Sequence, residues 1–184
     1  MNFTEELFMT ISIFLILLLA FLYLVSILIR WRQQKYKREA AQETRKFLQE
    51  VHQQFYSESL ESQLRIYPQP VQKFLQVTLG SHPPQTEVIR VTQKGLFRLK
   101  PKLSWMKMTC EEYFRTDQPG YIWHSKIQLK KILWIDVRDL YWNGHGEVRA
   151  KFLAFLTVAH NATPETAKGA FIRWVTETPW FPQA

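Results

Sequence analysis

The sequence predicts an α+β protein: an N-terminal transmembrane helix and helical stalk, then a mainly antiparallel curved sheet with a C-terminal helix. Three observations predict this class. An apolar run without a charged side chain occupies residues 7–29, and helical spacing of apolar residues continues to about residue 80. From residue 89 the period of the apolar residues changes to two, and a helix-start pattern returns at Thr163.

The apolar run from Leu7 to Ile29 is long enough to cross a bilayer. As a helix it would extend about 35 Å, compared with a hydrocarbon core of roughly 30 Å. A cleaved signal peptide would need a basic beginning, a shorter apolar segment and small residues at a cleavage site, and none of these is present. A core helix of a small domain would keep a polar face. We therefore expect a retained membrane anchor, with the lipid bilayer as its partner.

A basic cluster follows the apolar run directly, whereas no lysine or arginine precedes the run. This asymmetry predicts a single-pass protein of the cell membrane with its C-terminal domain in the cytoplasm. The bases are also predicted to contact anionic lipid, at about 1 kcal/mol each near the surface. The alternative is that they act as the topology signal alone. They are Arg30, Arg32, Lys35, Lys37 and Arg38.

The domain organisation follows from the same changes of pattern. We expect an N-terminal tail, a transmembrane helix, a basic juxtamembrane segment with a helical stalk, and a β-rich domain, over residues 1–6, 7–29, 30–65 and 66–184. Apolar residues at helical spacing in the stalk are Phe47, Leu48, Val51 and Phe55. Because this stripe is narrow, the stalk could pack on the domain, on the bilayer or on another chain. Pro70 then begins a short helix that ends at Gly80, and residues 81–84 form a connector.

Alternating apolar residues predict strands over residues 89–100, 121–130, 133–141 and 148–154. Residues 143–146, Asn-Gly-His-Gly, form the turn between the last two. The strands make an antiparallel meander with one apolar face and one basic face that meets water, as in a sheet covered on a single side. After it, Thr163 precedes a helix whose apolar positions are Phe171, Ile172, Trp174 and Val175. The following Trp180-Phe181-Pro182 motif is predicted to plug the open end of the sheet.

Composition excludes several functional classes. Apolar residues make up 46% of the 184 residues and aromatic residues 15%, which supports a packed core. The net charge of +8 is concentrated after the apolar run or alternates along strands, so we expect no nucleic-acid partner. The one cysteine, Cys110, cannot form an internal disulfide. The five histidines lack metal-ligand spacing, and no phosphate loop or nucleophile elbow occurs, so we expect no metal and no cofactor.

Asp139 is the most informative polar residue, because alternation places it on the same strand face as Val137 and Tyr141. A carboxylate carried into a core must be paired, hydrogen-bonded or protonated. One interpretation is a buried network from Asp139 to Arg173 that fixes the sheet against the last helix. The other interpretation is a polar spot inside an apolar binding surface that is rich in aromatic residues. The aromatic residues could instead serve only to pack the core. The candidate ligand-binding residues are Gln93, Trp105, Tyr121, Trp123, Asp139, Tyr141, Arg173 and Trp180.

Three functional hypotheses follow. The favoured one is a membrane-anchored, non-catalytic binding or assembly module that holds an apolar or amphipathic ligand, which could come from the membrane. The alternative is a membrane-tethered hydrolase that uses Asp139 with Glu112 or Glu177 as an acid–base pair. The third is a broken gene product without a function. A stable fold in a chain that lacks residues 1–38 would argue against the third hypothesis.

Short motifs after residue 66 resemble those of an uncharacterised group of bacterial proteins that carry a conserved domain of unknown function. The resemblance covers roughly residues 67–184 and depends on the order and spacing of its motifs. It implies a β-rich domain, such as a curved sheet of the lipoprotein-carrier kind, and no established activity. The motifs are Pro68-Gln69-Pro70-Val71, Gln93-Lys94-Gly95-Leu96-Phe97-Arg98, Trp105, Glu112-Tyr113-Phe114, Pro119-Gly120-Tyr121-Ile122-Trp123, Asp139-Leu140-Tyr141, Gly144, Gly146, Arg173-Trp174 and Trp180-Phe181-Pro182.

Two departures from that family pattern affect what the resemblance implies. Members of the group carry an acidic residue at the position of Ala170, so a role for that acid is not expected here. They also continue beyond the Trp180-Phe181-Pro182 motif into further strands. The resemblance therefore implies a shortened member or an incomplete product, in which part of the sheet is missing and an exposed edge could pair with a protein partner or a second copy.

Overall fold

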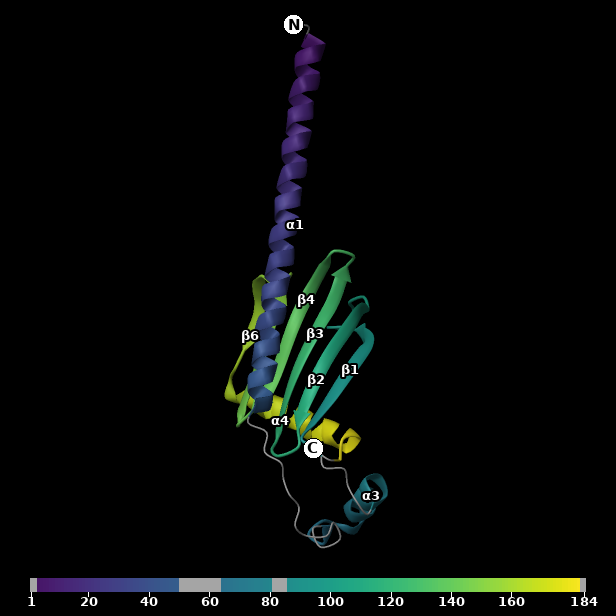
Figure 1. The fold of residues 1–184 in the computed structure, drawn as a ribbon. Helices are drawn as coiled ribbons and strands as arrows, with labels where there is room; N and C mark the ends of the chain where they lie inside the picture. Colours follow the sequence, from purple (N-terminus) through teal and green to yellow (C-terminus); the bar gives the residue numbers. More distant parts are fainter. Residues whose placement is uncertain (1–2, 50–63, 81–85, 183–184) are drawn as a thin grey trace.

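The structure is a computed structural model that describes residues 3–49, 64–80 and 86–182 (Figure 1). It confirms the predicted fold class: a long N-terminal helix, a six-stranded antiparallel sheet and a C-terminal helix. The elements are α1 (Phe3–Gln49), α3 (Gln69–Leu79), β1 (Val88–Phe97), β2 (Met106–Arg115), β3 (Gly120–Lys130), β4 (Leu133–Trp142), β5 (His145–Phe152), β6 (Leu156–Asn161), α4 (Pro164–Glu177) and the 3-10 turn η1 (Thr178–Trp180).

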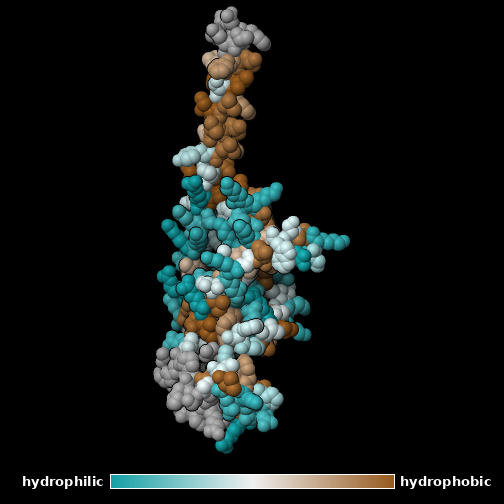
Figure 2. All heavy atoms as spheres, turned by 90° about the vertical axis from the view of Figure 1, so that its right-hand side faces the viewer, coloured by the Kyte–Doolittle hydropathy of each residue, from teal (hydrophilic) through white to brown (hydrophobic). Residues whose placement is uncertain are grey.

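Helix α1 is continuous from the apolar run into the charged segment that follows it. It is long and apolar enough to cross a membrane. Its N-terminal half projects away from the sheet, and its C-terminal half lies along the sheet (Figure 1). Figure 2 shows hydrophobic side chains on the projecting half and hydrophilic side chains where the helix meets the domain. The stalk residues Val51 and Phe55 lie outside the described residues, as do residues 81–84 of the predicted connector.

The six strands pair in sequence order, each antiparallel to the next. The β1–β2, β3–β4 and β5–β6 connections therefore lie at one end of the sheet, and the β2–β3 and β4–β5 connections lie at the other. The turn predicted over residues 143–146 is present but is confined to Asn143 and Gly144, with φ of 50° and 76°, because His145 and Gly146 belong to β5. Two successive positive φ values match the right-handed twist of a hairpin, and this sequence tolerates them well.

Two strands were not predicted. In β2 the inward positions include Glu112, which interrupts the apolar alternation that marks the other strands. The carboxylate is accommodated because it pairs with an arginine of α4. Strand β6 is an edge strand whose residues are all exposed, so burial imposed no alternation on its sequence. The strand assigned to residues 148–154 covers His145–Phe152 instead, and it ends before Leu153 and Ala154 because these two residues turn with φ of 51° and 60°.

Helix α4 covers one end of one sheet face (Figure 1). The core there contains Phe114, Tyr121 and Ala170, with partly buried Trp174 and Phe181 packed against it. Burial of Ala170 explains why a small side chain suits that position. The apolar stripe predicted on α4 is only partly correct, since Phe171, Ile172 and Val175 are exposed and only Trp174 is half-buried. Only the side of α4 that meets the sheet had to be apolar.

The prediction that the second face of the sheet meets water was wrong, because the C-terminal half of α1 packs on it. Phe47 of α1 is 2% exposed and contacts Trp142 edge-on, with ring centroids 5.9 Å apart. The Arg115 guanidinium donates to the Phe47 carbonyl oxygen at 2.9 Å. This face of the sheet carries charged side chains because some of them form ion pairs with α1, beside the apolar contacts.

Candidate functional site

Arg173 of α4 is the centre of the polar network on the α4 face. Its Nη1 donates to Asp139 Oδ2 of β4 at 2.7 Å, and its Nη2 donates to Glu112 Oε1 of β2 at 2.7 Å. Its Nε donates to Glu177 Oε1, one helical turn later, at 2.8 Å. One guanidinium therefore joins α4 to two strands through the donor geometry that arginine provides.

Aromatic rings enclose this guanidinium. Its carbon lies 4.7 Å from the ring centroid of Tyr121 and 5.1 Å from that of Trp123. Glu112 is 1% exposed, and burial raises the pKa of its carboxyl to about 8, although the Arg173 guanidinium lowers it. Glu112 is therefore the desolvated member of a partly buried cluster, and the positive charge of Arg173 opposes the effect of burial on its carboxyl.

The geometry matches the structural network predicted between Asp139 and Arg173. It also brings the three carboxylates of the hydrolase hypothesis together, but all three accept hydrogen bonds from one arginine. An acid–base pair has to exchange protons with a substrate. Here the charge on Arg173 and its hydrogen bonds hold these carboxyls in place instead, so they connect α4 to the sheet.

Asp139→Asn separates the two hypotheses. In a structural network the amide keeps an acceptor for Arg173 but loses the charge, so the free energy of unfolding should fall by about 1.5 kcal/mol. In an enzyme the same change should abolish turnover and leave the fold stable. Thermal unfolding of the variant beside the wild type measures the first effect, and Glu87→Gln, which removes the charge of an exposed carboxylate, is the control.

The structure gathers five of the eight predicted ligand-binding residues: Tyr121, Trp123, Asp139, Tyr141 and Arg173. Gln93 lies farther along the same face, where its side-chain oxygen accepts from the Cys110 thiol at 3.2 Å. Trp105 is in the β1–β2 connection and stacks under Arg98, whose guanidinium carbon is 4.5 Å from the ring centroid. Trp180 is 80% exposed. Of the predicted plug, Phe181 packs on Phe114, with centroids 4.9 Å apart.

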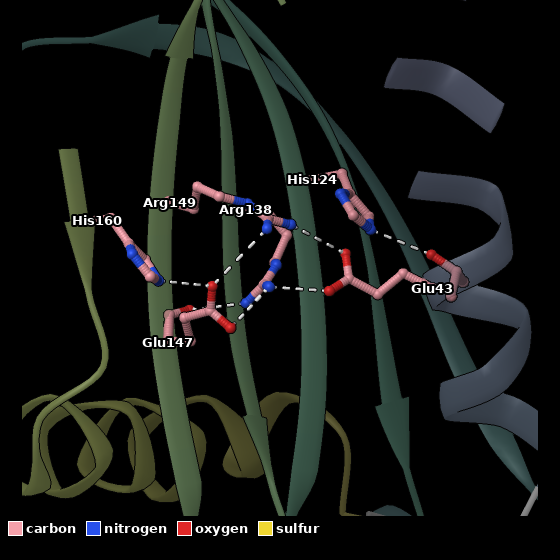
Figure 3. Close-up of polar contacts among 7 residues, drawn as sticks. Glu43, His124, Arg138, Glu147, Arg149 and His160 are labelled. Atoms are coloured by element: carbon pink, nitrogen blue, oxygen red, sulfur yellow. Dashed lines mark hydrogen bonds and ion pairs between the residues drawn. The ribbon is translucent and has the colours of Figure 1, made fainter. Parts of the chain in front are cut away.

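A second network joins α1 to the opposite face (Figure 3). Arg138 of β4 is 3% exposed, and its Nη2 lies 2.8 Å from Glu43 of α1 and 2.8 Å from Glu147 of β5. Arg149 also faces Glu43, at 3.8 Å, and His160 of β6 lies 3.0 Å from Glu147. Glu43 thus links α1 to β4 and β5.

His124 completes this interface. Its Nε2 is 3.1 Å from Thr44 Oγ1, and Figure 3 shows the His124 ring close to Glu43. Burial, together with the charge of Arg138, lowers the pKa of His124 to about 4, so the ring is neutral at pH 7. Beside it is a cavity of about 440 Å³ lined by Tyr36, Glu39, Ala40, Gln42, Glu43, Lys46, His124 and Arg149.

The stability of this interface should depend on pH. The pKa of His124 is about 4 in the folded protein and 6.5 in its ordinary state, so between these values the unfolded chain binds a proton that the folded chain does not. Stability should therefore fall as the pH decreases from 6.5 to 4. His124→Asn should flatten that part of the curve, which melting temperatures at a series of pH values would measure. An unchanged slope in the variant would contradict this role.

Sequence reasoning missed the second network because alternation assigned Arg138, Glu147 and Arg149 to a solvated face. One signal was available: Glu43 and Thr44 follow the basic segment on the same helix as Phe47, so the helix carries an acid, a hydroxyl and a ring at contact spacing. That pattern does not name its partner strands. The pairing emerges only when β4 and β5 lie side by side.

Comparison with known proteins agrees with the predicted resemblance at the level of the family. The chain belongs to a Family of unknown function (DUF6920), whose model matches residues 66–184. The matched region begins after α1 and contains the sheet and α4. No curated protein and no solved structure matches the chain.

Proposed function

We propose that this protein is a membrane-anchored, non-catalytic binding module that holds an apolar or amphipathic ligand from the bilayer. Membrane anchoring is supported by the length and composition of α1. A non-catalytic role is supported by the Arg173 network, in which the inward carboxylates bind a residue of the protein itself. The proposal places the C-terminal domain in the cytoplasm, because segments rich in lysine and arginine next to a transmembrane helix stay on the cytoplasmic side, and the basic cluster follows residue 29.

The observation that carries the ligand proposal is the apolar part of the α4 face beyond the contacts of α4, where the side chains are buried or half-buried. The strand register places two rows of small and apolar residues across the sheet, beyond the Arg173 network and toward the end where the hairpins β1–β2, β3–β4 and β5–β6 turn. The rows are Cys110, Ser125, Val137 and Ala150, and Met108, Ile127, Ile135 and Phe152.

Helix α4 contacts the sheet below these rows. Its side chains meet Glu112, Asp139 and Tyr141, and the backbone of α4 lies against Gly146. Among the described residues, the rows therefore form an apolar surface. This surface lies next to the end of the sheet that is nearer to the apolar half of α1 (Figure 1). An apolar surface in this place suits an acyl chain or an apolar peptide segment, and the adjacent bases suit an anionic head group.

Mass spectrometry of lipid that co-purifies with the detergent-solubilised full chain tests this proposal. We expect bound lipid in the wild type, and loss of that lipid in Ala150→Trp, which places a large ring at the β5 end of the first row. Thr109→Trp is the matched control, since Thr109 is exposed on the opposite face. Equal lipid content in all three folded proteins, or none in the wild type, would contradict the ligand proposal.

A further inference from the structure

The sheet runs alongside α1, and successive contacts fix their alignment. Phe47 meets Trp142 at one end, Thr44 meets His124 one turn earlier, and the Lys151 ammonium lies 5.6 Å from the Tyr36 ring centroid. At the far end the Arg32 guanidinium lies 4.8 Å from the ring of Phe155, in the β5–β6 connection. The strands therefore lie along the helix, and the end of the sheet with the β1–β2, β3–β4 and β5–β6 connections faces the apolar half of α1.

This alignment sets the depth of the hairpin connections relative to a bilayer. Arg32 follows the last residue of the apolar run, Ile29, by less than one turn, which is about 4.5 Å along the helix. If α1 spans the membrane, Phe155 lies at the level of the lipid head groups. The connections β1–β2 and β3–β4 turn at the same end of the sheet (Figure 1).

The β1–β2 and β3–β4 connections combine exposed apolar side chains with bases, and the β5–β6 connection presents an exposed phenylalanine. Ile132 is 74% exposed, Leu99 65% and Phe155 57%. The bases of the same segments are Arg98, Lys100, Lys102, Lys130 and Lys131. The two connections at the opposite end have neither feature: residues 116–119 read Thr-Asp-Gln-Pro, and residues 143–144 read Asn-Gly. A hairpin connection needs only residues that form a turn, at either end of the sheet. The fold therefore does not explain why exposed apolar side chains and bases occur at one end alone.

The β5–β6 connection is also held firmly in place. The Leu153 amide donates to the Trp134 carbonyl oxygen of β4 at 3.1 Å, and Ala154 is buried while its neighbour Phe155 is exposed. Leu153 and Ala154 adopt left-handed φ values that are uncommon for residues other than glycine. The connection thus presents Phe155 outward next to α1.

We propose that the β1–β2, β3–β4 and β5–β6 connections form a docking surface for the anionic face of the membrane that α1 spans. Exposed apolar and aromatic side chains would enter the interface, and the lysines would contact lipid phosphates. The domain is thereby held with the open end of its apolar rows at the bilayer. This inference rests on the proposed membrane anchor, and it adds the surface through which the domain itself contacts lipid.

Site-specific fluorescence in the full chain, reconstituted into vesicles, tests the proposal. In a Cys110→Ser background, Ile132→Cys and Phe155→Cys are labelled with an environment-sensitive dye. His145→Cys, at the opposite sheet end, is the matched control, and Leu18→Cys reports the anchor. Vesicles contain phosphatidylcholine with or without phosphatidylglycerol, and a lipid with a head-group nitroxide is the quencher.

We expect blue-shifted and quenched emission at positions 132 and 155, and solvent-like emission at position 145. Quenching at position 132 should increase with phosphatidylglycerol, and this increase should disappear when Lys100, Lys102, Lys130 and Lys131 are changed to Gln. Solvent-like emission at positions 132 and 155, with position 18 inside the bilayer, would overturn the docking surface and leave the anchor intact. Solvent exposure at position 18 would instead overturn the anchor.

Discussion

Arg173→Met should destabilise the domain by about 3 kcal/mol, because removal of the cation from a partly buried ionic network leaves the buried Glu112 carboxyl without compensation. Glu112 and Asp139 would lose their guanidinium donors in a desolvated site, and Tyr121 and Trp123 would lose the cation between their rings. For a domain of this size the melting temperature should fall on the order of 10 °C. Thermal unfolding followed by circular dichroism measures the change.

The controls for this variant come from the same helix. Lys168→Met also removes a cation from α4, but Lys168 is exposed, so its effect on the melting temperature should be small. Arg173→Lys keeps the charge and loses the fork that bonds three carboxylates, so an intermediate loss is expected. An Arg173→Met melting temperature equal to that of Lys168→Met would refute the clamp between α4 and the sheet.

Gly146→Ala is expected to displace α4 from the sheet. A Cβ at Gly146 would lie 2.4 Å from the Ala167 Cα and 2.8 Å from the Ala167 backbone nitrogen. Backbone atoms cannot rotate aside as a side chain can, so the helix has to move as a whole. Overpacking of this kind costs roughly 3 kcal/mol, and a matching loss of stability in urea unfolding would measure it.

Gly169→Ala is the matched control, since nothing lies within 4 Å of a Cβ placed there. Gly169 is inside α4, where alanine is favoured over glycine by about 0.5–1 kcal/mol. The two glycine changes should therefore act in opposite directions. Equal stability of Gly146→Ala and the wild type would mean that α4 does not pack against β5 as described.

The elements that could be predicted from the sequence are those whose pattern is local. The apolar length of residues 7–29, the helix after Thr163 and the Asn143-Gly144 turn each depend on neighbouring residues, and the structure contains all three as a helix, a capped helix and a hairpin turn. The pairing of Asp139 with Arg173 was also within reach, because an inward carboxylate requires a partner. Its distance of 2.7 Å is typical of a charged hydrogen bond.

The remainder depends on contacts between distant segments. β2 was missed because Glu112 breaks its alternation, and the reason for that carboxylate, Arg173, lies on another element. The cover on the polar face was missed because Glu43 of α1 pairs with Arg138, and neither residue indicates the other in sequence. Likewise, the hairpin bases are unremarkable singly, and only the strand order brings them to one end of the sheet.

The central claim is that α1 stays in the bilayer and holds the sheet domain against it. The most direct measurement is the intact mass of the protein in membranes that have been washed with alkaline carbonate. We expect a chain of 22.0 kDa, with its first residues present, that remains in the membrane pellet. A soluble chain cleaved after the apolar run would contradict the anchor, the bilayer source of the ligand and the docking surface together.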